Sequence, residues 1–196
     1  MSAGGRPARR PHEVRIVGGQ WKRSRIAVLD RPGLRPTPDR VRETLFNWLG
    51  QELTGWRCLD AFAGTGALGF EAASRGAAEV VLLERDPALS NALLATRERL
   101  GARERVRVER TDALAWMARA GDARFDLVFL DPPFEARIFD AALAAAAHLM
   151  RPGGFVYLEA DAEWPADGLA GLGLAPHRHL RAGAVHAHLL KSAGGG

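Results

Sequence analysis

The stretch Cys58-Leu59-Asp60-Ala61-Phe62-Ala63-Gly64-Thr65-Gly66-Ala67-Leu68-Gly69 decides the fold of this 196-residue chain. Its short apolar start is typical of a buried strand, and the spacing of its three glycines is typical of a loop that leaves a strand and enters a helix. Glycines in such a loop let a ligand approach the backbone closely. The segment therefore predicts one strand, loop and helix unit of an α/β fold.

Apolar runs alternate with helical patterns after this unit. The expected strands are 58–60, 80–84, 106–108, 127–131 and 155–159, and the expected helices are 67–75, 87–100, 113–119 and 137–150. Such alternation predicts a mostly parallel sheet with helices on both faces. Residues 176–180 and 185–190 are expected to add an antiparallel strand pair at one edge.

The first part of the chain is basic. Residues 1–42 contain eleven Lys and Arg against three acidic residues, whereas the remainder is mildly acidic. We expect a disordered basic arm at 1–12 and then a β-hairpin from 14–17 and 21–28. This asymmetry indicates a polyanionic partner, with a merely solvated charge run as the alternative. The hairpin residues expected to contact nucleic acid are Arg15, Trp21, Lys22, Arg23 and Arg25.

A helix is expected after the hairpin, with Thr37 as its N-cap and Pro38 in its first turn, running to about residue 52. The single cysteine, Cys58, excludes disulfides and cysteine metal clusters. The chain has neither an apolar run long enough to span a membrane nor the apolar core of a secretory signal. We expect a cytoplasmic protein without a membrane partner.

Four carboxylates, on Asp60, Glu84, Asp112 and Asp131, each follow an apolar run, so they are expected at the carboxyl edge of one sheet. The glycine pattern by itself fits a dinucleotide or S-adenosyl-L-methionine. A carboxylate at Asp60 would oppose a pyrophosphate but favour an ammonium and a sulfonium, which favours the methyl donor. We expect Glu84 to accept from ribose hydroxyls and Asp112 to lie near the adenine amino group, with a helix N-cap as the alternative for Asp112.

The corner Asp131-Pro132-Pro133-Phe134 ends the strand at 127–131. Proline cannot continue a central strand, so the two rings fix a stiff turn. The Asp131 carboxylate and the Pro132 carbonyl can accept from a planar exocyclic amine, and Phe134 can stack on its base. A simple turn after a strand is the alternative.

Two His-x-His pairs, His177 with His179 and His186 with His188, lie on the last two expected strands. Facing pairs can bind a metal. However, neither a cysteine nor an obvious carboxylate joins them, and alternate positions on an edge hairpin often carry solvated polar groups. The sequence therefore predicts no metal.

The segments Asp60–Gly66 and Asp131–Phe134 together resemble those of class I S-adenosylmethionine-dependent amino-methyltransferases. The segments Arg15–Gly19, Gly33–Thr37 and Asp39–Trp48 are similar to those of the RsmD family, the bacterial 16S rRNA guanine-N(2)-methyltransferases. The resemblance implies a seven-stranded Rossmann-like sheet with a small basic N-terminal hairpin. It also implies S-adenosyl-L-methionine as the cofactor and a guanine of 16S rRNA, within a small-subunit particle, as the substrate.

From the residues and the resemblance together, the expected catalytic residues are Asp131, Pro132, Pro133 and Phe134, and the expected cofactor-binding residues are Asp60, Phe62, Ala63, Gly64, Gly66, Glu84, Asp112, Arg35 and Thr37. The expected division is a basic arm at 1–12, an RNA-facing extension at 13–53, a catalytic domain at 54–191 and a flexible tail at 192–196. We expect a monomer. Three other functions remain open: an adenine-N(6) DNA methyltransferase, a nicotinamide-dependent dehydrogenase and a non-catalytic RNA-binding assembly protein.

Overall fold

The computed structural model describes residues 13–31, 34, 36–121, 124–133 and 138–193. The expected arm at 1–12, Arg35, Phe134 and residues 194–196 of the expected tail lie outside these ranges. Ser192, the expected first residue of that tail, is instead the last residue of a strand.

The elements in chain order are β1 (Glu13–Arg15), β2 (Arg25–Ala27), α1 (Asp39–Trp48), β3 (Arg57–Asp60), α2 (Ala67–Ser74), β4 (Glu79–Glu84), α3 (Pro87–Arg99), β5 (Val106–Arg110), α4 (Ala113–Arg119), β6 (Phe125–Leu130), α5 (Phe139–Leu149), β7 (Met150–Ala160), α6 (Ala166–Ala170), β8 (Leu174–Ala182) and β9 (Val185–Ser192).

The main sheet has seven strands in the order β5-β4-β3-β6-β7-β9-β8, and β1 and β2 form a separate antiparallel hairpin. The strands from β5 to β7 pair in parallel, whereas β9 is antiparallel to both β7 and β8. The predicted fold class is therefore confirmed, including the antiparallel pair at one edge. The chain order reverses between β3 and β6, and in open α/β sheets such a switch point creates a ligand crevice.

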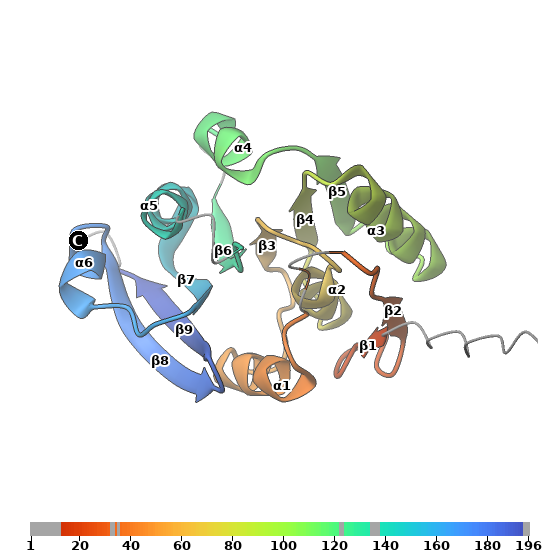
Figure 1. Ribbon diagram of the computed structural model, residues 1–196, viewed down its shortest axis with the longest axis horizontal. Coiled ribbons are helices and arrows are strands. Elements are labelled where there is room, and N and C mark those ends of the chain that lie inside the picture. Colours follow the sequence, from red (N-terminus) through yellow and green to blue (C-terminus); the bar gives the residue numbers. More distant parts are fainter. Residues whose placement is uncertain (1–12, 32–33, 35, 122–123, 134–137, 194–196) are drawn as a thin grey trace, which may run out of the picture.

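Helices cover both faces of the sheet because side chains alternate along its strands. Cys58 of β3 belongs to a core cluster that α1 and α2 complete, whereas the next residue, Leu59, belongs to a second cluster that α4 and α5 complete. In Figure 1 these two pairs of helices lie on opposite sides of the sheet. The first cluster also contains Val14, Ile16 and Ile26, so the hairpin β1–β2 shares the core of the sheet.

Several local expectations were wrong. Helix α1 ends at Trp48 instead of near residue 52, and its N-cap is Pro38. Thr37 does not cap the helix, because its hydroxyl donates a hydrogen bond to Glu159, 122 residues away. The hairpin strands have three residues each, and the connection between them is tied to α2, where the Trp21 N–H donates to Ser74 Oγ at 2.9 Å. The sequence pattern also missed α6.

A buried arginine fixes α1 against α2 and the hairpin. The Arg42 side chain is fully buried and lies 3.2 Å from the Glu71 carboxylate, which is also fully buried. Arg42 also donates to the Arg15 carbonyl and to Asp39 Oδ1, while Glu71 accepts from the Val17 N–H at 2.8 Å. A buried pair is stable only when its remaining donors and acceptors are satisfied, as they are here.

None of the helices in the described part of the chain has the length and the hydrophobicity that crossing a bilayer requires.

Candidate functional site

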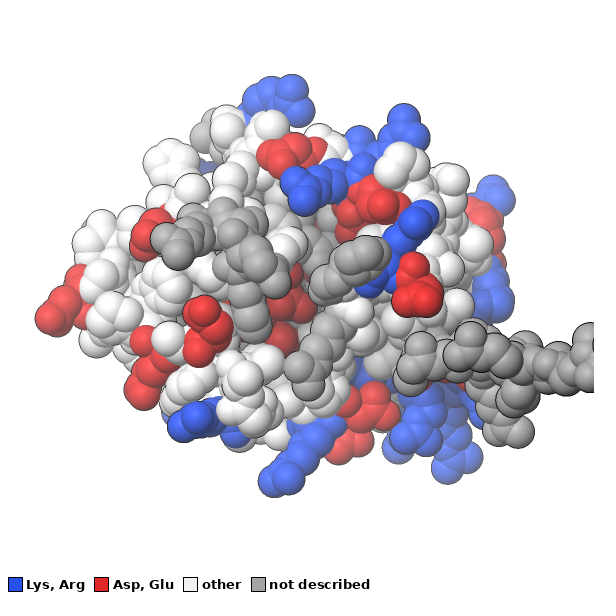
Figure 2. Space-filling view, viewed as in Figure 1, with Lys and Arg blue, Asp and Glu red and all other residues white. Residues whose placement is uncertain are grey.

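Four acidic side chains converge where parallel strands of the main sheet end. Asp60 ends β3, Glu84 ends β4, Asp131 follows β6 and Glu159 is the next-to-last residue of β7. The parallel pairing of β4, β3, β6 and β7 brings these strand ends to one edge. Figure 2 shows acidic side chains in the middle of this face as well as along its left edge, where Lys and Arg are sparse.

The loop between β3 and α2 is held by two of these carboxylates. Gly64 donates its N–H to Glu84 Oε2 at 3.0 Å, and Gly69 donates its N–H to Asp60 Oδ2 at 3.0 Å. Gly66 has a φ of +79°, and a Cβ at that position would lie 2.6 Å from a methyl carbon of Leu93. Only glycine fits this left-handed turn, in which the backbone packs closely against the side chains of Leu93 and Phe70.

Asp60 is an acid that the fold buries beside other acids. Asp60 is only 2% exposed. Burial and the nearby Glu84 and Glu159 carboxylates together raise its pKa to about 7, while the hydrogen bond from the Gly69 N–H opposes the rise. A cation next to Asp60 would restore the charged form. The position therefore suits a positively charged ligand group, as the sequence predicted.

Glu84 orders the backbone after two strands, at Gly64 after β3 and at Asp86 after β4. Besides the bond from Gly64, its Oε1 accepts from the Asp86 N–H at 2.7 Å. Each carboxylate oxygen has two lone pairs, so these bonds leave acceptor capacity for ribose hydroxyls. Asp112 is exposed and caps α4 by accepting from the Ala115 N–H at 2.9 Å. Asp112 is therefore a helix N-cap, as the alternative interpretation predicted, and the contact of Asp112 with an adenine stays a prediction.

Asp131, Pro132 and Pro133 directly follow β6, which ends at Leu130, and the stiffness expected of this corner stays a prediction. Asp131 is partly buried, Pro132 is buried and Pro133 is exposed. Burial raises the pKa of Asp131 well above its usual value, and the carboxylates of Glu159 and Asp60 add to the rise. Asp131 therefore lies close to the acid that ends β3, on the adjacent strand.

Glu159 and Tyr157 belong to the site but were not predicted. Glu159 Oε1 accepts from the Tyr157 hydroxyl at 2.8 Å and from the Thr37 hydroxyl at 2.6 Å, and all three residues are buried. Burial, together with the Glu159 carboxylate, raises the pKa of Tyr157. The signal for Glu159 was in the sequence, since it follows an apolar strand as the other four acids do. Through Thr37, the N-terminal segment reaches the carboxyl edge of the sheet.

Two other predicted cofactor residues line the same loop. Phe62 is partly buried and packs against the second core cluster, whereas Ala63 is 7% exposed and donates its N–H to the Leu83 carbonyl at 3.0 Å. Arg35 and Phe134 lie outside the described residues.

The predicted RNA-contacting charges lie on the surface of the hairpin and its connection. The side chains of Arg15 and Arg25 are 66% and 69% exposed, and each forms one ion pair, with Asp39 and Glu13 respectively. Lys22 and Arg23 are exposed, and Trp21 is partly buried against the first core cluster. A shallow cavity of about 180 Å³ is lined by Arg15, Ile16, Val17, Lys22, Arg23, Asp39 and Glu43.

The sequence matches a family model and several known proteins over most of its length. A family model described as "Conserved hypothetical protein 95" matches residues 14–191. The protein named Ribosomal RNA small subunit methyltransferase D from Escherichia coli (strain K12) is 41% identical over 157 residues, covering 77% of this chain and 76% of that protein.

The fold is also similar to solved structures of proteins named as methyltransferases. The structure of the Escherichia coli protein yhhF has a TM-score of 0.79 and 34% identity, covering 93% of this chain and 99% of that chain. The T. thermophilus 16S rRNA N2 G1207 methyltransferase (RsmC), solved in complex with AdoMet and guanosine, has a TM-score of 0.72 and 25% identity. It covers 94% of this chain and 50% of that chain.

Proposed function

The chain belongs to the family described as conserved hypothetical protein 95, and from that premise we propose that it transfers a methyl group from S-adenosyl-L-methionine to the 2-amino group of a guanine in 16S rRNA. The resemblance to the RsmD family is thereby confirmed. The proposed substrate, a guanine of 16S rRNA, is taken from the names of proteins similar to this chain. One of them was solved in complex with AdoMet and guanosine.

The residues at the strand ends fit the proposed methyl donor. Buried Asp60 lies among other carboxylates, so the two positive charges of S-adenosyl-L-methionine would compensate an otherwise unfavourable cluster. We assign Gly64, Gly66 and the adjoining Phe62 and Ala63 to the loop that the donor contacts, and Glu84 to its ribose hydroxyls. When bound, the donor supplies a methyl group on a sulfonium, which is an electrophile for a weak amine nucleophile.

Asp112 is assigned to the adenine end of the donor, where its exposed position leaves it accessible. Thr37 is assigned to the donor side of the crevice because its hydroxyl lies against Glu159. Arg35 is carried over from the family resemblance alone.

Asp131 is assigned to the acceptor amine. The lone pair of a guanine amine is delocalised into the ring, so the nitrogen needs acceptors that orient it and that stabilise the positive charge as the new N–C bond forms. The Asp131 carboxylate and the Pro132 carbonyl are those acceptors, with Pro133 keeping the corner stiff. In its ionised form Asp131 can also accept the proton that the amine loses. Phe134 is assigned to stacking on the flipped base, a contact worth about 1–3 kcal/mol.

The basic hairpin is assigned to the RNA backbone. Arg15, Lys22, Arg23 and Arg25 would contribute phosphate contacts that give affinity without sequence choice. Trp21 is partly buried, which leaves part of its ring for a base. We propose residues 13–53 as the RNA-facing extension and 54–191 as the catalytic domain, acting as a monomer on a small-subunit particle.

The observation that carries this proposal is the position of Asp131 next to Asp60. Their strands pair directly, with Asp60 opposite Phe129, and the carboxylate of Asp60 acts on the pKa of Asp131. An amine held at Asp131 is thus adjacent to a site for a cation, which is the arrangement that methyl transfer from a sulfonium requires.

The test is transfer of a labelled methyl group from S-adenosyl-L-methionine to small-subunit particles, naked 16S rRNA and DNA, followed by identification of the methylated nucleoside. We expect N(2)-methylguanosine in 16S rRNA. Labelled N(6)-methyladenine in DNA would refute the proposal in favour of a DNA methyltransferase, and absence of any transfer would favour the non-catalytic alternative.

A pair of variants tests the division of roles at the corner. Asp131→Ala is expected to reduce turnover more than Phe134→Ala, because positioning can contribute roughly 7–11 kcal/mol to barrier reduction whereas stacking contributes about 1–3 kcal/mol. Single-turnover rates at saturating donor measure the difference. Equal losses, or a larger loss for Phe134→Ala, would contradict these roles.

A further inference from the structure

The outer hairpin of the main sheet places three histidines on one face. In the antiparallel pairing of β8 and β9, His179 lies directly opposite His188. His186 precedes His188 by two residues, so its side chain points to the same face of the sheet. The ring nitrogens that the three side chains offer all lie within 4.8 Å of one another.

A β-bulge determines which histidines come together. The register of β8 shifts between Pro176 and Arg178, which removes His177 from the alternation that the sequence suggested. His177 packs against Phe155 instead, with 5.4 Å between the ring centroids. The two His-x-His pairs are therefore not equivalent, and one of the four histidines is separated from the others.

The distances within the cluster are close to those of a metal site. His179 Nε2 and His186 Nδ1 are 3.1 Å apart, and the centroids of the His179 and His188 rings are 4.6 Å apart. Tetrahedral zinc with Zn–N bonds of 2.0–2.1 Å separates its nitrogen ligands by about 3.4 Å.

Two groups on the loop after β7 would orient these rings. His188 is 4% exposed, and its Nε2 lies 3.3 Å from the Ala162 carbonyl oxygen. A carbonyl oxygen only accepts, so this contact places the proton on Nε2 and leaves Nδ1 available. Glu163 Oε1 lies 4.0 Å from His179 Nδ1, on the side opposite the nitrogen that faces His186. Histidines that bind metals commonly have such a carbonyl or carboxylate partner on their other nitrogen.

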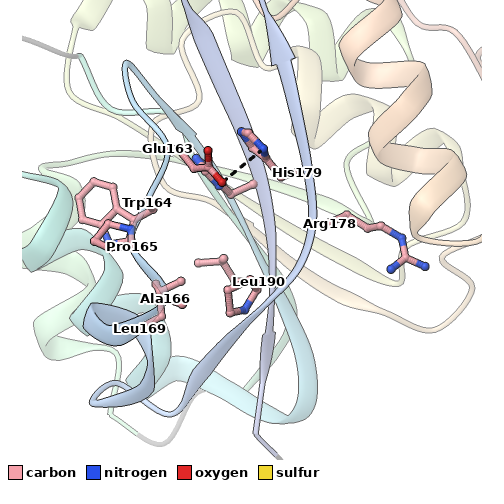
Figure 3. Close-up of a pocket in the computed structure, with 10 residues that line it drawn as sticks. Glu163, Trp164, Pro165, Ala166, Leu169, Arg178, His179 and Leu190 are labelled. Atoms are coloured by element: carbon pink, nitrogen blue, oxygen red, sulfur yellow. Dashed lines mark ion pairs between the residues drawn. The ribbon is translucent and has the colours of Figure 1, made fainter.

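The carboxylate corrects one expectation from the sequence, in which no acidic residue joined the histidines. Glu163 comes to them because the loop after β7 turns back over the hairpin, as Figure 3 shows for Glu163 and His179. A cavity of about 410 Å³ borders the cluster, lined by Glu163, Trp164, Pro165, Ala166, Leu169, Pro176, Arg178, His179, His188 and Leu190. In Figure 3 the Arg178 side chain extends away from Glu163 and His179, so its positive charge does not point toward the histidines.

We propose that His179, His186 and His188 bind one divalent transition-metal ion, with Zn²⁺ as the best match. Three imidazoles without a thiolate suit zinc, copper or nickel and do not suit magnesium or calcium. Glu163 orients His179 from its other ring nitrogen, and water would fill the fourth position of a tetrahedral ion. Because His179 lies on β8 and the other two histidines on β9, the ion would join the two outermost strands, and Glu163 would connect them to the loop after β7.

The test is isothermal titration of Zn²⁺ into the untagged full-length chain. We expect one ion per chain in the wild-type protein. Loss of a partner that only orients a ligand typically weakens metal binding by about 10- to 100-fold, which is the effect expected of Glu163→Gln. His179→Gln and His186→Gln remove a ligand itself, so each should weaken zinc binding by at least about a hundredfold. His177→Gln is the matched control, because it removes a histidine from the same strand without touching the cluster.

A second readout is the midpoint of thermal unfolding, which also establishes that each variant folds. An ion that binds the folded chain at a hundredfold excess over its Kd should raise the wild-type Tm by about 5–10 °C and leave that of His179→Gln unchanged. Unchanged zinc affinity in His179→Gln, an equal loss in His177→Gln, or absence of binding to the wild-type chain would overturn the proposal.

Discussion

Replacing the buried acid of β3 in Asp60→Asn should stabilise the ligand-free protein at high pH. Asp60 has a pKa of about 7 in the folded chain, against 3.8 for an unperturbed aspartate. In the folded state it therefore retains a proton between about pH 4 and pH 7 that the unfolded state has lost. The contribution of this bound proton to the free energy of unfolding is fully present below pH 3.8, declines as pH rises and is lost above about pH 7.

The size of this effect follows from the shift of about three units, each worth 1.36 kcal/mol, which gives a cost of roughly 4 kcal/mol at pH 8. At pH 5 the cost is roughly 1.5 kcal/mol, because Asp60 is protonated in the folded state there and pH 5 is only about one unit above the pKa of an unperturbed aspartate. An asparagine keeps the size and an acceptor for the Gly69 N–H but has no charge. We therefore expect the advantage of the variant in unfolding free energy to grow by roughly 2–3 kcal/mol from pH 5 to pH 8.

Urea unfolding of wild type and Asp60→Asn at pH 5, 6, 7 and 8 measures this difference. Asp86→Asn is the matched control at the same edge of the sheet. Asp86 is partly exposed, and hydrogen bonds from the Leu89 and Ala88 N–H groups lower its pKa, so that it is ionised in both states throughout this range. Its substitution should therefore produce a difference that does not change with pH.

The same substitution should weaken binding of S-adenosyl-L-methionine, because Asp60 would lose its attraction for a cation. The difference in Kd between wild type and Asp60→Asn should be largest at pH 8 and should shrink at pH 5.5, where Asp60 is mostly protonated before binding. A stability difference that does not vary with pH, or an unchanged Kd at pH 8, would refute the reasoning.

Two further pairs of substitutions test the scaffold by urea unfolding. Arg42→Met should destabilise the chain by about 3–5 kcal/mol, because it removes the cation from a buried ion pair. Arg40→Met, at an exposed position two residues earlier on the same helix, should change stability by less than about 0.5 kcal/mol. Gly69→Ala should cost about 1–3 kcal/mol, since its Cβ would collide with the Leu82 side chain, whereas Gly168→Ala in α6 meets no neighbouring atom and should be neutral or stabilising. The reverse order in either pair would contradict these packing arguments.

The sequence predicted the sheet and its carboxyl edge because those features follow from local patterns. Apolar runs separated by helical periods determine a parallel sheet, and a parallel sheet brings the residues after its strands to one edge. Asp60, Glu84 and Asp131 could thus be placed together before any coordinates. Glu159 obeys the same rule and was overlooked, although the strand before it was predicted.

The errors arose where a long-range partner competed with a local one. Thr37 is a residue type that commonly caps helices, and it lies just before α1. However, its hydroxyl donates to the buried carboxylate of Glu159, 122 residues later. The pair of Arg42 with Glu71 has no local signal, since it joins two helices. The grouping of the histidines depends on a bulge near His177, and residue alternation alone cannot reveal a bulge.

The carboxylates at the strand ends are difficult to explain as stabilising groups. Asp60 and Asp131 each have a raised pKa, and each is raised partly by Glu159, so the ligand-free fold holds acids that disfavour one another's charge. Neighbouring Arg42 and Glu71 show that the same chain can pair a buried charge with an opposite one. Among the described residues, the side chains that shift the pKa of Asp60 are carboxylates, which raise it, and none of them is a cation. Under the proposed function a cationic ligand would resolve the conflict at Asp60 and an amine donor would resolve it at Asp131, so the cluster of acids is itself an argument for methyl transfer from a sulfonium to a nitrogen.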